Sequence, residues 1–263
     1  MPSTTTRTIT LTGPDAAGFA NAQLGSDVLV LSTGRWQWSG WLDPKGRVRA
    51  LLQVARLADD RFVLVPRGGD ARTLAQDLGR FVFRSKVRID VSGELHVSDG
   101  DAFGDGCARE DDSGTLSLGE GDASLRVGKN SGNDAWIARH IANGYAWLPD
   151  AALGTLLPPA LSMERLGAVA FDKGCFPGQE IAARLHFLGG HKRHLRSARI
   201  EGSIALDEGQ TLRINGKDAG IVLMQDRISQ SPTTLVVLDD TMSQVETLDI
   251  GDARLHVIST FAA

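Results

Sequence analysis

The stretch FDKGCFPGQEIAAR, at residues 171–184, is the most informative part of this chain. Gly174 and Gly178 predict a sharply bent backbone, because glycine adopts conformations closed to other residues. A proline comes just before Gln179, and proline favours the first turn of a helix. We therefore expect a helix to begin near Gln179, with Cys175 beside its N-terminus.

Cys175 is the candidate reactive group of this stretch. A helix N-terminus and a nearby ammonium both favour the thiolate form, so we expect Lys173 to activate the thiol electrostatically. Gln179, Glu180 and Arg184 would fix the geometry of the turn or bind a ligand. The alternative is an inert cysteine buried in a tight turn. The clustering of Cys175 with charged and polar residues favours the functional interpretation.

A basic stretch follows at residues 181–200. It has no Asp or Glu and carries five basic side chains, although the whole chain has a net charge of −4. They are Arg184, Lys192, Arg193, Arg196 and Arg199. This asymmetry indicates an anionic partner such as a phosphate, a polycarboxylate or RNA, or else a solvated face beside a strand. A Cys–His pair with His186, His191 or His194 is conceivable, but we expect solvated histidines.

Composition limits the class of protein. The chain has 263 residues, of which 42% are hydrophobic and 23% charged, enough for a large core in one or two domains. Its two cysteines, Cys107 and Cys175, cannot build a disulfide scaffold or a four-ligand zinc site, so no metal site is expected. Its apolar runs are short and its first residues lack a signal pattern, which predicts a cytoplasmic protein without a membrane partner.

Periodicity predicts an α+β amino-terminal part with an antiparallel sheet. Strands are expected at 6–11, 36–41, 47–57, 62–65 and 86–91. Helices are expected at 16–24, with Asp15 as N-cap, and at 70–79.

The rest of the chain divides into three segments of different composition. Residues 100–121 are acidic and rich in glycine, which predicts a mobile surface loop and not a calcium site. Helices are then expected at 133–143 and 160–168. From residue 199 onward, short β-rich runs alternate with turns, at 212–214, 220–224, 234–238 and 253–258. They predict a small all-β barrel or sandwich.

Trp36 and Trp38 share one face of the expected strand at 36–41. Their rings could stack on a flat heterocycle, or they could pack against the sheet or in the core, which is the more common role.

The residues Lys173 to Glu180 resemble the Lys-Gly-Cys-Tyr/Phe-x-Gly-Gln-Glu signature of the YgfZ family, relatives of the glycine-cleavage T-protein. Gly174, Phe176 and Gly178 are part of that match. The resemblance extends over most of the chain, through segments that look like the family's turns and strands. These are Gln23-Leu24, Asp27-Val28, Asp43-Pro44-Lys45-Gly46-Arg47, Ser85-Lys86-Val87, Leu157-Pro158-Pro159 and Lys192-Arg193.

The resemblance implies a T-protein-like α+β fold around a central folate pocket. Residues 1–195 would form two intertwined subdomains and residues 196–263 a C-terminal β-barrel. It also implies a folate-binding accessory protein, not a conventional enzyme, that supports assembly or repair of iron–sulfur enzymes, including those that thiolate tRNA. The implied cofactor is tetrahydrofolate or a derivative, with no stably bound cluster. The alternative is a tetrahydrofolate-dependent aminomethyltransferase or demethylase.

By the same resemblance, the folate contacts would come from one set of residues, with Arg193 meeting the glutamate tail. The set is Gln23, Asp27, Trp36, Trp38 and Arg193. The chain departs from the family at three places: Gly25 replaces a threonine, Ala142 replaces a carboxylate, and an asparagine is lost near Ser162. A third hypothesis, direct RNA binding through Arg184 to Arg199, is disfavoured by the overall acidic charge.

Overall fold

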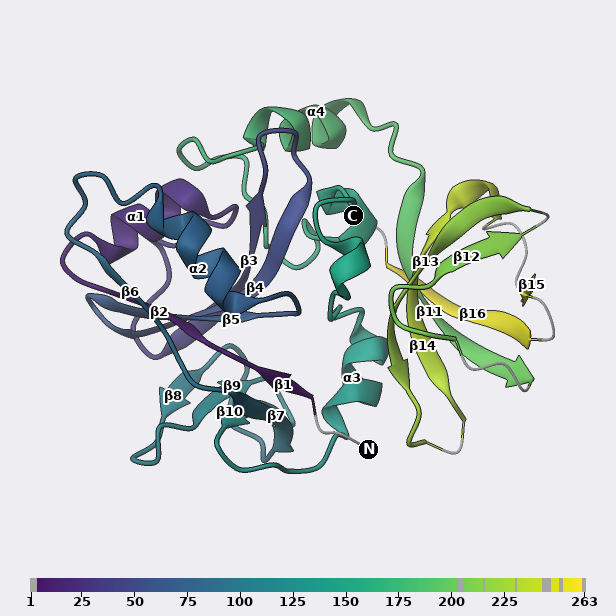
Figure 1. Ribbon diagram of the computed structural model, residues 1–263, viewed down its shortest axis with the longest axis horizontal. Coiled ribbons are helices and arrows are strands. Elements are labelled where there is room, and N and C mark those ends of the chain that lie inside the picture. The colour runs from purple at the N-terminus through teal and green to yellow at the C-terminus, as the bar shows by residue number, and fades with distance from the viewer. Residues whose placement is uncertain are drawn as a thin grey trace.

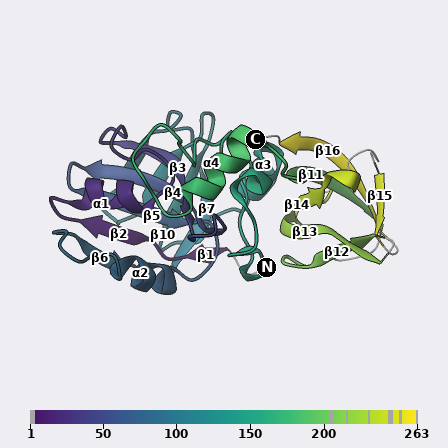
Figure 2. The ribbon, with the colours of Figure 1, turned by 90° about the horizontal axis from the view of Figure 1, so that it is seen from above.

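The structure is a computed structural model that describes residues 4–202, 206–214, 216–229, 231–242, 247–250 and 253–261. Its strands form three antiparallel sheets, with short helices on and between them (Figure 1). Seen from above, the amino-terminal and C-terminal sheets lie at opposite ends of the molecule, with α3 and α4 between them (Figure 2).

The amino-terminal sheet has the order β3-β4-β5-β2-β6. Its strands are β2 (Ile9–Thr12), β3 (Arg35–Leu42), β4 (Val48–Ala58), β5 (Arg61–Pro66) and β6 (Arg88–Val91). Helices α1 (Ala16–Gln23) and α2 (Ala71–Gly79) cover one face and bury a core of their own. The expected strands and helices are confirmed here, except that the expected strand at 6–11 is divided between β1 (Thr5–Thr6), which belongs to another sheet, and β2. Asp15 is the N-cap residue of α1, as expected, but its side chain makes no capping hydrogen bond. Its carboxylate accepts a hydrogen bond from the backbone N–H of Lys86, 2.6 Å away, and so ties α1 to the segment before β6.

The middle sheet has the order β1-β7-β10-β9-β8. Its strands are β1 (Thr5–Thr6), β7 (Leu95–Gly100), β8 (Ala108–Glu110), β9 (Leu116–Gly119) and β10 (Ser124–Gly128). The expectation of a mobile loop at 100–121 is wrong, because β8 and β9 lie within it. Leu116 and Leu118 alternate with serine and threonine and are 3% and 0% exposed. That two-residue period is a strand signal which the surrounding glycines and acidic residues concealed.

The C-terminal sheet has the order β12-β13-β14-β11-β16-β15 and curls until β12 and β15 approach each other. Its strands are β11 (Arg193–Gly202), β12 (Thr211–Ile214), β13 (Lys217–Asp226), β14 (Thr233–Asp239), β15 (Thr247–Ile250) and β16 (Ala253–Phe261). The expected all-β character is confirmed for the described residues, with one short 3₁₀ turn, η3 (Asp240–Met242), between β14 and β15.

Two α-helices and two 3₁₀ turns connect the sheets: α3 (Trp136–Asn143), η1 (Asp150–Ala152), η2 (Pro158–Leu161) and α4 (Gln179–Leu188). The expected helix at 160–168 is wrong. The chain forms only η2 and then a turn at Ser162, whose φ is +52°. A residue with positive φ cannot continue a right-handed helix, so the chain turns away at Ser162.

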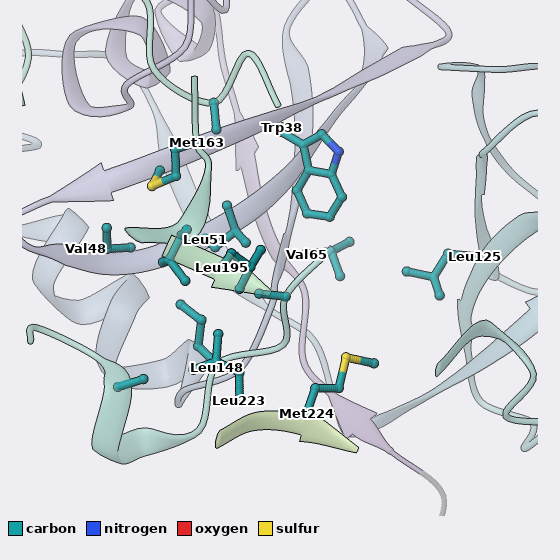
Figure 3. Close-up of a cluster of buried hydrophobic side chains, with 14 of the residues drawn as sticks. Trp38, Val48, Leu51, Val65, Leu125, Leu148, Met163, Leu195, Leu223 and Met224 are labelled. Carbon is teal, nitrogen blue, oxygen red and sulfur yellow. The ribbon is translucent and has the colours of Figure 1, made fainter. Parts of the chain in front are cut away.

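One hydrophobic cluster joins all three sheets (Figure 3). Trp38 and Leu51 reach it from the amino-terminal sheet, Leu125 from the middle sheet, and Leu195 and Leu223 from the C-terminal sheet. The four leucines are each at most 1% exposed. The region between the three sheets where these residues lie is therefore filled with apolar side chains.

Candidate functional site

The Cys175 segment adopts the expected turn before a helix. Helix α4 begins at Gln179, and Gly178 is its N-cap with φ +77°. Cys175 lies four residues before the first helical residue, and its side chain is exposed. The chain bends at residues 171–174 and turns at 177–178, as expected. Gly174 has no positive φ and a Cβ there would meet no atom within 4 Å, so of the two glycines only Gly178 is required by its conformation.

Gly178 packs against the distant turn at 43–46. A Cβ on Gly178 would lie 2.9 Å from the Cα of Gly46, and a Cβ on Gly46 would lie 2.8 Å from the Cβ of Ile181 in α4. The turn is held by the Asp43 carboxylate, which accepts from the backbone N–H groups of Lys45 and Arg47 at 2.8 and 2.9 Å. Two segments that carried the family resemblance thus meet through two glycines.

Lys173 fastens this segment to the end of α1. Its ammonium donates to the backbone carbonyls of Asn21, Leu24 and Ser26 at 2.6, 2.6 and 2.8 Å. Burial lowers the pKa of the Lys173 amine to about 8, partly offset by the charge of Asp27. All three ammonium protons are used in these bonds. Activation of Cys175 by Lys173 stays a prediction.

The other motif residues divide between the interior and the surface. Phe176 is buried, with its ring 5.2 Å from the Lys173 nitrogen, and Gln179 is half-buried. Glu180 and Arg184 are exposed on the outer face of α4. The interior half of the motif therefore anchors the segment, while its outer half faces solvent.

Two of the three nearby histidines have acidic partners. His186 pairs with Glu164 at 2.7 Å, and His194 pairs with Asp240 at 2.7 Å. His186 is exposed, as expected, whereas His194 is half-buried. In both rings the carboxylate lies on Nδ1, and among the described residues neither ring hydrogen-bonds to Cys175.

The basic stretch exposes fewer positive charges at the surface than its sequence indicates. Arg196 is 2% exposed and pairs with Asp240 at 3.0 Å. Arg184, Lys192 and Arg199 are exposed, whereas Arg193 is half-buried. The positive charge available at the surface therefore lies around the end of α4 and along β11.

The expected folate contacts lie in two places. Trp36 and Trp38 are 9% and 6% exposed, and the Trp36 Nε1–H donates to the Gly119 carbonyl at 2.9 Å. Trp38 packs on Tyr145, with ring centroids 5.2 Å apart. Both indoles belong to the core cluster and offer no free stacking face in this conformation.

Gln23 and Asp27 lie near the Lys173 anchor. The Gln23 amide oxygen is buried and has no hydrogen-bond partner among the described residues. The Asp27 carboxylate accepts from the Leu29 N–H at 3.0 Å, and the Gln37 amide donates to the Asp27 carbonyl at 2.9 Å. Arg193 is remote in sequence from both, at the start of β11 opposite Asp239 of β14.

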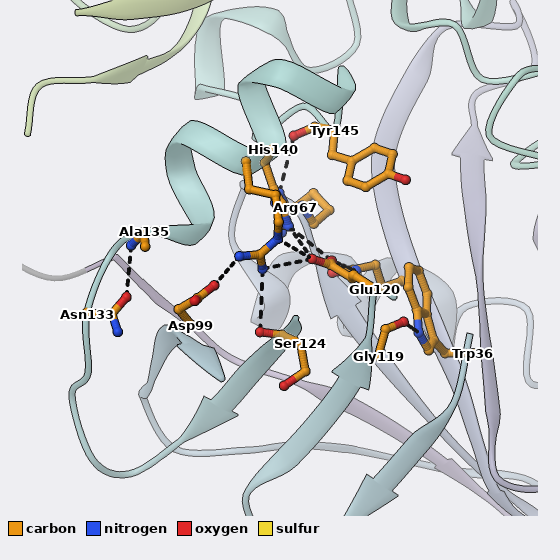
Figure 4. A network of polar contacts seen from close by, with 12 residues as sticks. Trp36, Arg67, Asp99, Gly119, Glu120, Ser124, Asn133, Ala135, His140 and Tyr145 are labelled. Atoms are coloured by element: carbon orange, nitrogen blue, oxygen red, sulfur yellow. Dashed lines mark hydrogen bonds and ion pairs between the residues drawn. The ribbon is translucent and has the colours of Figure 1, made fainter. Parts of the chain in front are cut away.

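A buried polar network that sequence reasoning missed joins the sheets (Figure 4). Arg67 follows β5, Glu120 follows β9, and His140 lies in α3. Arg67 Nη2 lies 2.7 Å from His140 Nδ1, and His140 Nε2 lies 2.9 and 3.0 Å from the Glu120 oxygens. Arg139 also pairs with Glu120, at 3.0 Å, and with Asp99. One sequence signal pointed to this network, which is that the acidic Glu120 follows the alternating Leu116 and Leu118.

The partners fix the protonation of His140. Arg67 can only donate, so Nδ1 must accept, and the proton of a neutral ring must sit on Nε2 and point to Glu120. Burial and the charge of Arg67 lower the pKa of His140 to about 4, against the opposing effect of Glu120. Burial opposes ionisation of Glu120, but its bonds to His140 and Arg139 and the charge of Arg67 outweigh this and lower its pKa.

Arg67 is enclosed by indole rings. Its guanidinium carbon lies 4.6 to 5.6 Å from the ring centroids of Trp38, Trp136 and Trp147, and the residue is 0% exposed. Burial lowers its pKa to about 9. Cation–π contacts and the Glu120 charge replace part of the hydration that a buried guanidinium loses.

Ala142 stands where the family resemblance leads us to expect a carboxylate. It lines a cavity of about 330 Å³ between α3 and the C-terminal sheet, together with Ala138, hydroxyl side chains of β11 and β16, and the carboxylate of Asp226 at the end of β13. A methyl group there can neither accept nor supply a proton.

Comparison with known proteins shows which sequences this chain is similar to. The chain is 25% identical to a tRNA-modifying protein YgfZ from Klebsiella pneumoniae, over 94% of this chain and 88% of the relative. It is 24% identical to a protein of the same name from Escherichia coli, over 89% and 83%. The chain resembles the YgfZ proteins along most of its length. An uncharacterised Haemophilus influenzae protein is 24% identical over 81% of this chain and 79% of its own. No family profile matches the chain.

The fold is that of an aminomethyltransferase. The crystal structure of the glycine cleavage system aminomethyltransferase T from Bartonella henselae matches with a TM-score of 0.72. The match covers 96% of this chain and 82% of the other, at 17% sequence identity. The expected T-protein-like α+β fold is thereby confirmed. No helix in the described residues has the length and apolar character needed to cross a membrane.

Proposed function

We propose that this chain is a folate-binding accessory protein that supports iron–sulfur enzymes of tRNA modification through the thiol of Cys175. The similarity to tRNA-modifying YgfZ proteins supports a role in tRNA modification. The observation that carries the proposal is the exposed Cys175 on a segment that Lys173 and Gly178 anchor from behind. A cysteine that served only packing would be buried.

The thiol is tested by complementation in a strain that lacks its own YgfZ protein. We expect the Cys175→Ser variant to fold normally and to leave the thiolated nucleosides of tRNA at the level of the deletion strain. Cys107→Ser is the matched control, because Cys107 is the other free cysteine and lies directly before β8, in another part of the fold. Restoration of thiolated nucleosides by Cys175→Ser would refute the role of the thiol.

Folate binding is a separate part of the proposal. The orphaned amide oxygen of Gln23 favours a donor-bearing ligand at the end of α1, whereas Trp36 and Trp38 would need their neighbours to move before they could stack on one. Titration calorimetry with tetrahydrofolate and its polyglutamate form should show saturable binding. Arg193→Ala should weaken the binding of the polyglutamate form more than the binding of the monoglutamate form. The absence of heat with either ligand would remove folate from the proposal.

The alternative is a tetrahydrofolate-dependent aminomethyltransferase or demethylase. Such chemistry needs a group that moves a proton at the reacting centre. Ala142 cannot do this, which favours the accessory role. Turnover of a methylamine donor with tetrahydrofolate, at a rate that Cys175→Ser leaves unchanged, would favour the transferase instead.

A further inference from the structure

The outer face of α4 exposes two adjacent large apolar side chains. Phe187 and Leu188 are 72% and 77% exposed. Helix α4 lies across one edge of the molecule, between the amino-terminal sheet and β11 (Figures 1 and 2). Single exposed apolar residues are common, but an exposed Phe-Leu pair at the end of a helix is costly to leave in water.

The aromatic half of this pair is held in place before any partner arrives. The ring of His186 stacks on Phe171 at 4.5 Å, and the ring of Phe187 meets His186 edge-on at 4.6 Å. The pair between His186 and Glu164 fixes the middle ring. A fixed aromatic side chain loses little conformational entropy on binding, which is the property of an interface anchor.

The charged side chains one turn before the pair and just after it are basic, whereas the acidic Glu180 lies a further turn away at the start of α4 and Glu164 is paired with His186. Arg184 lies on the same face, three and four residues before Phe187 and Leu188, and Lys192 is exposed just beyond the helix. No acidic residue occurs between 181 and 200. The complementary surface is therefore an apolar pocket with carboxylates at its rim.

We propose that Phe187, Leu188, Arg184 and Lys192 form a docking surface for a protein partner with such an acidic-rimmed apolar pocket. The proposal rests on the proposed function, since we assign the partner to the iron–sulfur enzymes served through Cys175. RNA is disfavoured as the occupant, because an aliphatic side chain lies at the centre of the surface and the chain carries a net charge of −4. Docking through α4 would hold the partner beside the segment that carries Cys175.

The test is site-specific photo-crosslinking in cells. Benzoylphenylalanine is placed at Phe187 in the full chain and, as the matched control, at Phe83, which is 84% exposed on the amino-terminal part. We expect the probe at position 187, but not at 83, to give one adduct with an iron–sulfur enzyme of tRNA modification. Arg184→Glu with Lys192→Glu should lower the adduct yield at least fivefold. An adduct with a second copy of the chain, with RNA, or with no macromolecule would overturn the proposal.

A second measurement separates this proposal from the proposed function. Phe187→Ser with Leu188→Ser should keep the thermal midpoint of the parent, lose the crosslinked partner and reduce tRNA thiolation, whereas Phe83→Ser should leave thiolation intact. Full thiolation in the double variant would refute the docking surface. Full thiolation in Cys175→Ser together with a retained adduct would refute the thiol's role and leave the docking surface standing.

Discussion

Gly178 and Gly46 lie against each other with no room for a side chain between them: a Cβ on Gly178 would lie 2.9 Å from the Cα of Gly46. The two residues are far apart in the sequence, yet each has a positive φ, +77° and +74°. Their contact sets the distance between the turn at 43–46 and the start of α4. The position of the Cys175 segment therefore depends on both glycines.

Substitution of Gly178 should destabilise the fold. Gly178→Ala places a Cβ in the left-handed region and against the 43–46 turn, so we expect a loss of about 1–3 kcal/mol of unfolding free energy. Urea denaturation followed by tryptophan fluorescence measures it. Gly174→Ala is the control and should change stability little, because open space surrounds Gly174. Equal midpoints for the two variants would contradict this account of the turn.

One substitution distinguishes two possible roles of Lys173, anchoring of the segment and activation of the thiol. If it anchors the segment, Lys173→Met leaves three carbonyls without their donor and should cost about 1–3 kcal/mol. Amide hydrogen exchange at residues 24–28 should then accelerate. If it activates the thiol, the same variant should instead slow the alkylation of Cys175 by iodoacetamide at neutral pH. Lys45→Met, at an exposed lysine of the adjoining turn, is the control for lost charge. We expect the stability effect.

The His140 ring predicts a pH dependence of stability. Its pKa is about 4 in the folded protein, below the 6.5 of an unperturbed histidine, so the unfolded chain takes up the proton first as the pH falls. The contribution is complete above pH 6.5 and is lost between 6.5 and 4, to a total of about 3 kcal/mol. Urea midpoints across this range should fall more steeply for the parent than for His140→Gln, whose amide can still accept from Arg67 and donate to Glu120. Parallel slopes would contradict a neutral buried His140.

Removal of Arg67 should be among the most damaging single substitutions. Arg67→Met leaves the buried Glu120 with less compensation, which typically costs about 3–5 kcal/mol. The double variant with Glu120→Gln removes both charges and should recover part of the loss. Thermal unfolding of the three proteins gives the coupling between the two residues. A double variant no more stable than Arg67→Met would show that Arg67 acts through its indole contacts and not through Glu120.

The sequence predicted best where a local pattern determines structure. The alternation at Trp36 to Trp41 and the Pro-Gly-Gln start of α4 depend on neighbouring residues, and both are confirmed. Glycine and acidic residues around Leu116 and Leu118 hid a strand whose leucines are buried in the cluster that residues from all three sheets build. The network of Arg67, Glu120 and His140 was beyond reach for the same reason, since its members come from three separate elements. In the motif, the sequence located Cys175, but the carbonyl partners of Lys173 lie some 150 residues away.

The hydrophobic cluster shared by the three sheets has a consequence for how the protein can change over time. Leu195 and Leu223 of the C-terminal sheet fill the same interior as Leu51 and Leu125. A larger residue in one sheet therefore needs a smaller one in another, so substitutions in the barrel and in the amino-terminal part should occur in matched pairs. Exchange of the barrel for that of a relative should fail unless its inward-facing residues are exchanged with it.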